Sequence, residues 1–343
     1  MKKFFLLSVL FISCAFSQEY DVSVFLGPGK DASYKGIMDY PFHVSFDSKG
    51  NMYVVEYDGS YLGVLNTAGE FKHLGGDGTW NFREENGPVG NAQFKGLHNI
   101  IIDDEDKVYI TDTFNNRCRM YDPVSGKIST YIGSGQKGFN GENVKAGEAS
   151  FNELYSIAFN PDKSRIFIAD LKNQRIRVMD RKTGLVSTVA GTGKKGKPVD
   201  GTAALESTFV DPRALACDSK GNIYVVDRGG HALRVIKDGK VFTLVNKAGK
   251  KGRKLGNGPD AQLAGPKYVG IDAEDRVWIA DDENDRICMY DPKSKQLTAV
   301  IGKDSPLSQW ETKRTHGLYI HKNGTIYVVD SKNNRILKMV KKQ

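Results

Sequence analysis

Residues 326–335, Ile-Tyr-Val-Val-Asp-Ser-Lys-Asn-Asn-Arg, join a β-branched and aromatic run to Asp330, Asn333 and Arg335. Such a short apolar run followed by turn-forming residues is typical of a buried β-strand. The run recurs along the chain, and the carboxylates that close it lie 49 to 58 residues apart, at Glu56, Asp112, Asp170, Asp227, Asp281 and Asp330. A period of this size indicates a repeat architecture.

Each copy predicts four short strands and none shows sustained helical periodicity. An inner apolar strand precedes the quoted run, and fourth strands are expected at 127–132, 185–190, 240–245 and 296–301. The sixth copy ends at Gln343 after three strands, whereas residues 21–26 carry the missing fourth-strand pattern. We therefore expect an all-β, six-bladed propeller that the N-terminal strand closes by completing the last blade.

The first 17 residues predict a signal peptide. They combine Lys2 and Lys3 with an apolar segment and the small residues Ala15 and Ser17, and the segment is too short to span a bilayer. The expected product is an exported, periplasmic or secreted monomer without a transmembrane segment, with one propeller domain at 18–343. Lipid attachment at Cys14 is the alternative.

Composition narrows the classes of partner. The chain has 39% hydrophobic and 26% charged residues and a formal net charge of +8. Because Lys and Arg are scattered among acids, we expect a polyanionic sugar rather than nucleic acid as partner. Cys118, Cys217 and Cys288 fall within apolar runs and are expected to be free thiols.

A second motif, Asp-x-x-Asn-x-Arg, follows the second strand in four copies, for example at Asp112–Arg117 and Asp281–Arg286. With glycine-rich stretches such as 133–141, this motif resembles the NHL-repeat six-bladed β-propellers over essentially the whole mature chain. The resemblance places the chain in a superfamily with peptidyl-amidating lyases and with gluconolactonase-like and strictosidine-synthase-like propellers. We expect the repeated Asp and Arg to pair within each blade as a structural feature.

Blade-specific residues at one level of the ring are the best candidates for a site. The loops before the inner strands, 76–96, 133–153, 191–211, 246–265 and 302–315, are long enough to carry function. At the start of each inner strand the chain has Phe42, His98, Tyr155, Arg213, Lys267 and His316, and the next positions include His43 and Asn99.

This set of cations, imidazoles and a phenol suits a carboxylate ligand beside an acidic proton. We expect β-elimination on a uronic acid unit of an acidic oligosaccharide, by a lyase if a sugar leaves or a dehydratase if water leaves. The expected roles are catalytic for His98, Tyr155, Arg213 and His316, and substrate-binding for His43, Asn99, Lys267, Trp80 and Arg83, with Trp310 as a further wall residue.

Two alternatives stay open. A propeller channel lined by polar residues can also serve a non-catalytic glycan-binding or protein-binding protein. A metal-dependent lyase or lactone hydrolase is the other, in which His43, His98 and His316 hold one divalent metal ion, as the resemblance to the zinc-binding amidating lyases implies.

Overall fold

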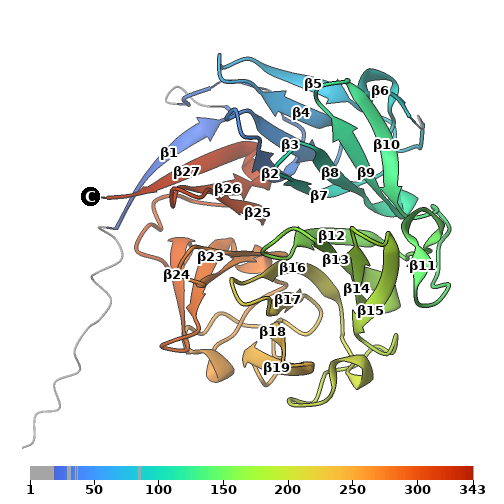
Figure 1. Cartoon of the computed structure of the whole chain (residues 1–343). Coiled ribbons are helices and arrows are strands. Elements are labelled where there is room, and N and C mark those ends of the chain that lie inside the picture. Colours follow the sequence, from blue (N-terminus) through green and yellow to red (C-terminus); the bar gives the residue numbers. More distant parts are fainter. Residues whose placement is uncertain (1–18, 29–31, 35, 37, 84–85, 343) are drawn as a thin grey trace, which may run out of the picture.

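The computed structural model describes residues 19–28, 32–34, 36, 38–83 and 86–342. Within these residues the chain forms six β-sheets that stand around a common centre as the blades of a propeller (Figure 1). The predicted all-β six-bladed ring is confirmed. The expected signal peptide at 1–17, with Cys14, lies outside the described residues. No helix of the described part is long and apolar enough to cross a membrane.

Each blade is a sheet of four main strands, and the first strand of each blade packs against the first strands of its neighbours. Blade one contains β2 (Pro41–Phe46), β3 (Met52–Glu56), β4 (Leu62–Leu65) and β5 (Phe71–Gly75); blade two contains β7 (Leu97–Ile102), β8 (Val108–Asp112), β9 (Arg117–Asp122) and β10 (Lys127–Ile132). Blade three contains β12 (Leu154–Phe159), β13 (Arg165–Asp170), β14 (Arg175–Asp180) and β15 (Leu185–Ala190); blade four contains β16 (Pro212–Cys217), β17 (Ile223–Asp227), β18 (Ala232–Lys237) and β19 (Lys240–Val245). Blade five contains β21 (Tyr268–Ile271), β22 (Val277–Asp281), β23 (Arg286–Asp291) and β24 (Gln296–Gly302); blade six contains β25 (Thr315–Ile320), β26 (Ile326–Asp330), β27 (Arg335–Lys341) and β1 (Tyr20–Leu26).

The ring closes where the two ends of the chain meet. Strand β1 pairs antiparallel with β27, from Tyr20 opposite Lys341 to Leu26 opposite Ile336. Figure 1 shows β1 and β27 side by side, as the N-terminal closure predicted. Closure gives blade six its fourth strand and joins it to both ends of the chain, so many short strands form one stable unit.

The long connections are more ordered than the sequence suggested. Three of them add a two-residue strand to the outer edge of the following blade: β6 (Gly87–Pro88), β11 (Val144–Lys145) and β20 (Gly256–Asn257). Single 3-10 turns also lie in the connections or after second strands, at η2 (Val89–Asn91), η3 (Thr113–Asn115), η4 (Ala146–Glu148), η5 (Leu171–Asn173), η6 (Ala204–Glu206), η7 (Gly258–Asp260), η8 (Asp282–Asn284) and η9 (Ser331–Asn333). Elements of two or three residues are too short for a hydrophobic period to reveal.

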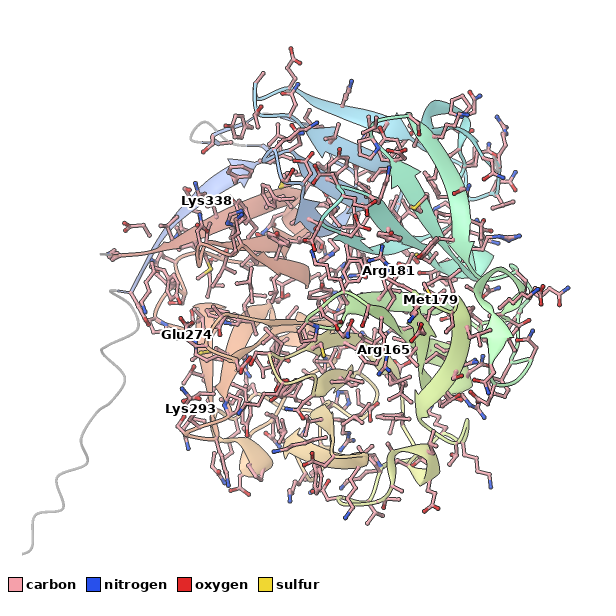
Figure 2. All side chains as sticks on the ribbon, in the orientation of Figure 1. Arg165, Met179, Arg181, Glu274, Lys293 and Lys338 are labelled. Carbon is pink, nitrogen blue, oxygen red and sulfur yellow. The ribbon has the colours of Figure 1, made fainter. Side chains whose placement is uncertain are left out.

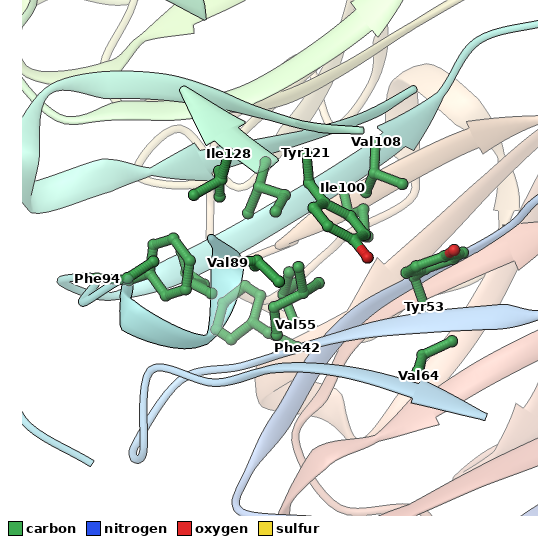
Figure 3. Close-up of a cluster of buried hydrophobic side chains, with 14 of the residues drawn as sticks. Phe42, Tyr53, Val55, Val64, Val89, Phe94, Ile100, Val108, Tyr121 and Ile128 are labelled. Atoms are coloured by element: carbon green, nitrogen blue, oxygen red, sulfur yellow. The ribbon is translucent and has the colours of Figure 1, made fainter. Parts of the chain in front are cut away.

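The hydrophobic core is divided among the spaces between neighbouring blades. Between blades one and two, Val55 and Val64 pack with Ile100, Val108 and other apolar side chains (Figure 3). Full burial of such a side chain contributes about 1.5–3 kcal/mol. Free Cys118 and Cys288 are buried and Cys217 is half-buried, in agreement with the expected free thiols.

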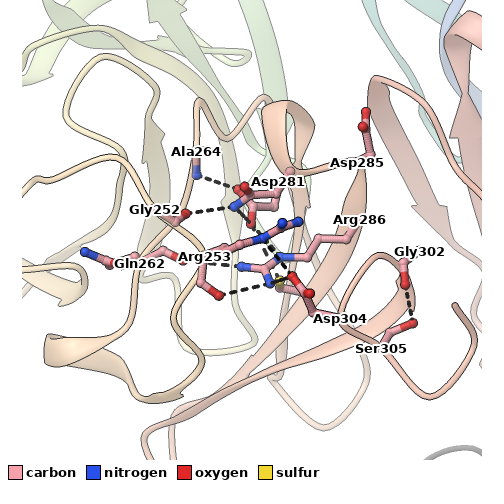
Figure 4. Close-up of polar contacts among 12 residues, drawn as sticks. Gly252, Arg253, Gln262, Ala264, Asp281, Asp285, Arg286, Gly302, Asp304 and Ser305 are labelled. Carbon is pink, nitrogen blue, oxygen red and sulfur yellow. Dashed lines mark hydrogen bonds and ion pairs between the residues drawn. The ribbon is translucent and has the colours of Figure 1, made fainter.

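A buried carboxylate closes the second strand of every blade, and in five blades it pairs with an arginine. Asp281 and Arg286 lie 2.8 Å apart, as the motif predicted (Figure 4). Asp330 and Arg335 lie 2.7 Å apart, also as predicted. In blades two to four the partner is instead seven residues after the aspartate: Arg119 for Asp112, Arg177 for Asp170 and Arg234 for Asp227. In blade one, Glu56 pairs with His73 at 2.7 Å.

The prediction of Arg117 and Arg175 as partners is therefore wrong by two residues. Side chains two apart on a strand project from the same face, so either position can reach the carboxylate. Arg175 instead donates to the backbone oxygens of Asn173 and Thr192.

Replacement of Arg286 by leucine should strongly destabilise the fold. Asp281 and Arg286 have fully buried side chains, so the variant leaves a buried carboxylate without its partner, which costs about 3–5 kcal/mol. The matched control is Arg165→Leu, which breaks the exposed pair with Asp180 and should cost under about 1 kcal/mol. Guanidinium unfolding followed by circular dichroism measures both, and equal midpoints for the two variants would contradict the structural role.

Candidate functional site

Four of the six residues expected at the start of the inner strands surround a fifth, Phe42. The ring centroids of His98, His316 and Tyr155 lie 4.6, 4.5 and 6.2 Å from that of Phe42. The Lys267 Nζ lies 5.1 Å from the same centroid. The sixth residue, Arg213, lies over Tyr155 with its guanidinium carbon 4.6 Å from the ring centroid. We call these six residues the inner-ring cluster.

The closing carboxylates hold the segments that lead into the cluster. In five blades the carboxylate accepts a hydrogen bond from the backbone N–H three residues before the cluster residue. These bonds measure 2.5–2.9 Å and come from Asp39, Lys95, Asn152, Ala264 and Lys313 to Glu56, Asp112, Asp170, Asp281 and Asp330. In blade four Asp227 accepts from the N–H of Asp211 at 2.7 Å, two residues before Arg213, and from that of Val210 at 3.4 Å. The structural repeat therefore sets the position of each blade-specific side chain.

Asp282 is a central residue that the sequence reasoning missed. Its side chain is fully buried and lies within ion-pair range of four groups from three blades. The nearest atoms belong to His316 at 3.2 Å, Arg314 at 3.4 Å, Arg228 at 3.7 Å and Lys267 at 3.9 Å. The signal was present one residue after the closing carboxylate, where the blades differ: Tyr57, Thr113, Leu171, Arg228, Asp282 and Ser331.

The charges of the site perturb one another. Burial raises the pKa of Asp282, but the close contact with His316, 3.2 Å away, and the charges of Lys267 and Arg314 outweigh it, so the pKa lies below its ordinary value. Burial lowers the pKa of Lys267 to about 7, and the guanidinium groups of Arg213 and Arg228 add to this against the pull of Asp282. Lys267 therefore titrates near neutral pH.

The two imidazoles of the cluster are held neutral. Burial lowers the pKa of His316 to about 4, although Asp282 favours the protonated form. Burial and the charges of Lys267 and Arg213 hold the pKa of His98 well below its ordinary value. Burial raises the pKa of Tyr155 well above its usual range, so its phenol stays protonated. The Arg213 guanidinium donates to that phenol oxygen at 3.4 Å.

Charge and aromatic surface are separated around the axis. The cations come from blades four to six: Arg213 and Arg228, Lys267, and Arg314. The aromatic side chains at the level of the cluster come from blades one to three, namely Tyr40, Phe42, Tyr57, His98 and Tyr155. By contrast, Lys293 and Lys338 lie at outer parts of blades five and six (Figure 2). The centre thus offers a cationic side and an aromatic side to one ligand.

Several buried polar atoms of the site have no hydrogen-bond partner among the described residues. They are Nε of Arg213, Nε of Arg228, both carboxylate oxygens of Asp282 and Nδ1 of His316. Buried polar groups in folded proteins are nearly always paired. Their concentration here marks the cluster as a place that a polar ligand or water can complete.

His43 and Asn99 each follow a cluster residue on an inner strand, and both are buried. His43 accepts from the Ile100 N–H at its Nδ1 and donates from Nε2 to the Leu318 oxygen at 3.1 Å. The Asn99 amide lies 3.5 Å from the Tyr268 hydroxyl of the opposite blade, and its oxygen accepts from Ile157 N–H. These residues tie blades together.

His43, His98 and His316, the three expected metal ligands, do not converge on one point where a metal ion could bind. Over the described ranges, no group of three or more His, Cys, Asp or Glu side chains is placed to hold a metal ion. His43 uses both ring nitrogens on neighbouring backbone groups, as described above. The divalent metal stays a prediction without a geometric argument in its favour.

Of the loop residues expected to contact the substrate, Trp80 lies near the cluster and Arg83 and Trp310 do not. Trp80 lies beside the cluster, with its ring 5.1 Å from that of Tyr57, which is itself 5.1 Å from His98. Arg83 is exposed and bridges to Gln93 within its own loop. Trp310 packs on the core between blades five and six and lines a separate surface pocket with Glu311 and Asn333.

Comparison with known proteins agrees with the repeat. The NHL repeat model matches residues 314–339. Protein SUPPRESSOR OF QUENCHING 1, chloroplastic, of Arabidopsis thaliana is 25% identical over 293 residues, which are 80% of this chain and 27% of that protein. The chain thus spans under half the length of the curated relatives it matches first.

Two solved structures illustrate the range of similar propellers. An auxiliary nutrient binding protein from Bacteroides ovatus superposes with a TM-score of 0.67 at 13% identity, over 95% of this chain and 78% of that chain. Virginiamycin B lyase from Staphylococcus aureus superposes with a TM-score of 0.56 at 12% identity, over 94% and 99% of the two chains. At such identities the likeness shows the fold, and the chemistry has to be argued from the site.

The histidines should titrate in two separate groups. His43 and His316 should have midpoints of about 4, because burial disfavours their charged forms. His73 should titrate above the ordinary histidine range, because its hydrogen bond to Glu56 stabilises the charged ring. Proton NMR of isotope-labelled histidine measures this order, and protonation of His316 before His73 on acidification would contradict the described burial.

Proposed function

We propose that this chain, an NHL-repeat six-bladed β-propeller, binds a uronic acid unit at the inner-ring cluster and catalyses β-elimination across it. The single observation that supports this most is the convergence of Arg213, Arg228, Lys267 and Arg314 beside one apolar floor formed by Phe42. A carboxylate-bearing sugar matches both parts, since its anion suits the guanidinium groups and its ring suits the aromatic side.

The charge balance favours an incoming anion. The four cations face three nearby carboxylates, Asp211, Asp282 and Glu283, and Glu283 also pairs with Lys251 at 2.7 Å. One positive charge is therefore in excess when Lys267 is neutral. A bound carboxylate would neutralise this excess and would accept from the guanidinium nitrogens that lack a partner.

Lys267 is the best candidate for the base. The sequence suggested His98 or His316, since an ordinary imidazole titrates near neutral pH. Because burial lowers the pKa of His316 to about 4, that ring is a weak base in this site. Lys267, with its pKa lowered to about 7, is partly neutral at physiological pH and lies 3.1 Å from the His316 Nε2, which positions it.

The elimination step balances with the residues present. Neutral Lys267 takes the proton from the carbon that bears the carboxylate, and Arg213 and Arg228 stabilise the enolate that forms. The electron pair then forms a carbon–carbon double bond while the bond to the leaving oxygen breaks. Tyr155 delivers its proton to that oxygen, and the adjacent Arg213 stabilises the phenolate. Solvent returns a proton from Lys267 to Tyr155 before the next turnover.

A binding protein without chemistry is the second candidate. The structural likeness to an auxiliary nutrient binding protein favours this reading, and the same cationic and aromatic sides would serve it. Incubation with uronic acid oligosaccharides separates the two. A rise in ultraviolet absorbance from the new conjugated double bond supports elimination, whereas calorimetric binding with no absorbance change supports the second candidate.

Lys267→Met should lower kcat by about 10²–10⁴-fold, because it removes the proton acceptor. In the unchanged protein, kcat/KM should rise with pH through about 7, since the neutral amine is the active form. Lys293→Met, an exposed lysine of blade five, is the matched control and should keep full activity (Figure 2). Retained activity of Lys267→Met, or a rate that falls as pH rises through 7, would exclude this base.

Arg213→Ala should weaken binding of a uronate, because the variant loses a cation that faces the cluster without disturbing the blade's Asp227–Arg234 pair. The expected loss is at least tenfold in affinity, the scale of one charge-assisted hydrogen bond. Calorimetric titration measures it, with Arg165→Ala as a surface control. Unchanged affinity would remove Arg213 from the proposed carboxylate site.

A further inference from the structure

We propose that Trp80 and Phe114 form a second subsite, which stacks the sugar unit adjacent to the one held in the inner-ring cluster. This inference rests on the proposed function, because the unit in the cluster anchors the ligand. It makes the ligand an oligosaccharide that extends outward over blade two. We call Trp80 and Phe114 the aromatic shelf.

Comparison of the blades with one another shows that both shelf residues are peculiar to blade two. Trp80 forms a parallel bridge to Phe94, and Lys137 and Lys195 form the same bridge to Phe151 and Phe209 in the following blades. Phe114 is the middle residue of η3, where η5, η8 and η9 have Lys172, Glu283 and Lys332. The repeat therefore does not require an aromatic residue at either position.

Phe114 supports one face of the Trp80 indole and the indole is held in place. The two rings stack at 5.5 Å between centroids and 22° between planes. The Trp80 Nε1 donates to the backbone oxygen of Asp58 at 2.9 Å, which fixes the indole and leaves the face away from Phe114 as the available surface. Trp80 remains 39% exposed. Exposed, pre-oriented aromatic faces are suited to stacking against a sugar ring.

Space for Phe114 depends on Gly96. A Cβ at Gly96 would lie 2.4 Å from the Phe114 ring, and Gly96 has a φ of +68°. The corresponding residues of blades one, three and six are Tyr40, Glu153 and Arg314, and blade five has Gly265, beside Glu283 in place of an aromatic residue. Blade two thus combines a glycine with an aromatic residue, and Phe114 lies close over the backbone.

The shelf is continuous with the inner-ring cluster. Phe114 lies 5.6 Å from His98, and Tyr57 lies 5.1 Å from both Trp80 and His98. The cations lie on the other side of the axis, in blades four to six. A ligand whose carboxylate faces those cations therefore has its remaining chain directed toward blade two, where the shelf meets the next unit.

Binding of monomers and trimers tests the subsite. The probes are glucuronate, galacturonate and mannuronate and their homotrimers, titrated calorimetrically into the full chain. For the uronate that binds, the trimer should bind about tenfold more tightly than the monomer, and Trp80→Ala should remove this gain while monomer affinity stays unchanged. Phe139→Ala is the matched control, since Phe139 is 38% exposed in the equivalent loop of blade three and stacks on Arg175.

The possible results separate the two proposals. Monomer binding without a trimer gain, or a gain that survives in Trp80→Ala, overturns the subsite and leaves the proposed carboxylate site intact. A gain lost equally in Phe139→Ala also overturns it, because the effect is then not specific to the shelf. No binding by any monomer or trimer overturns both proposals. Thermal unfolding of Trp80→Ala at the unchanged midpoint shows that the variant is folded.

Discussion

The buried carboxylate at the end of each second strand is the contact on which the rest of the molecule depends. It accepts from the backbone of the segment that leads into the inner strand of the same blade, and in five blades an arginine balances its charge. Burial raises the pKa of Asp112 to about 6 even though hydrogen bonds from Asn115 and Lys95 and the charge of Arg119 lower it, so these contacts are needed to keep the carboxyl ionised. Because the same contact recurs in each blade, the residues that differ between blades lie at the same height along the propeller axis.

The blade-specific residues at the propeller axis form an asymmetric site. Cations of blades four to six and aromatic rings of blades one to three meet over Phe42, and Asp282 links His316, Lys267, Arg228 and Arg314. Low exposure strengthens every one of these interactions, since the local dielectric is well below that of water. Burial lowers the pKa of both basic groups, with different results. His316, with a pKa of about 4, becomes a weak base, whereas Lys267, with a pKa of about 7, titrates near neutral pH.

The sequence predicted the ring, its closure by residues 21–26 and the level at which the cluster lies, because all three follow from the repeat period. It did not identify Arg119 and Arg177 as partners, since positions five and seven after the aspartate share one face of a strand. Asp282 was missed because only the inner-strand level was compared between blades. The pKa order of Lys267 and His316, and the use of His43 as a tie between blades, depend on burial and on neighbours from distant segments, which no local pattern encodes.

The account claims that the blade-specific residues at the axis form one carboxylate-binding site. A crystal structure of the protein with a bound uronate oligosaccharide tests this most directly. The account predicts a carboxylate within hydrogen-bond distance of Arg213 or Arg228, with the sugar ring over the aromatic side formed by Phe42 and Tyr57. A ligand bound in the outer grooves between blades, for example beside Lys237 and Tyr290, with the inner-ring cluster untouched, would contradict it.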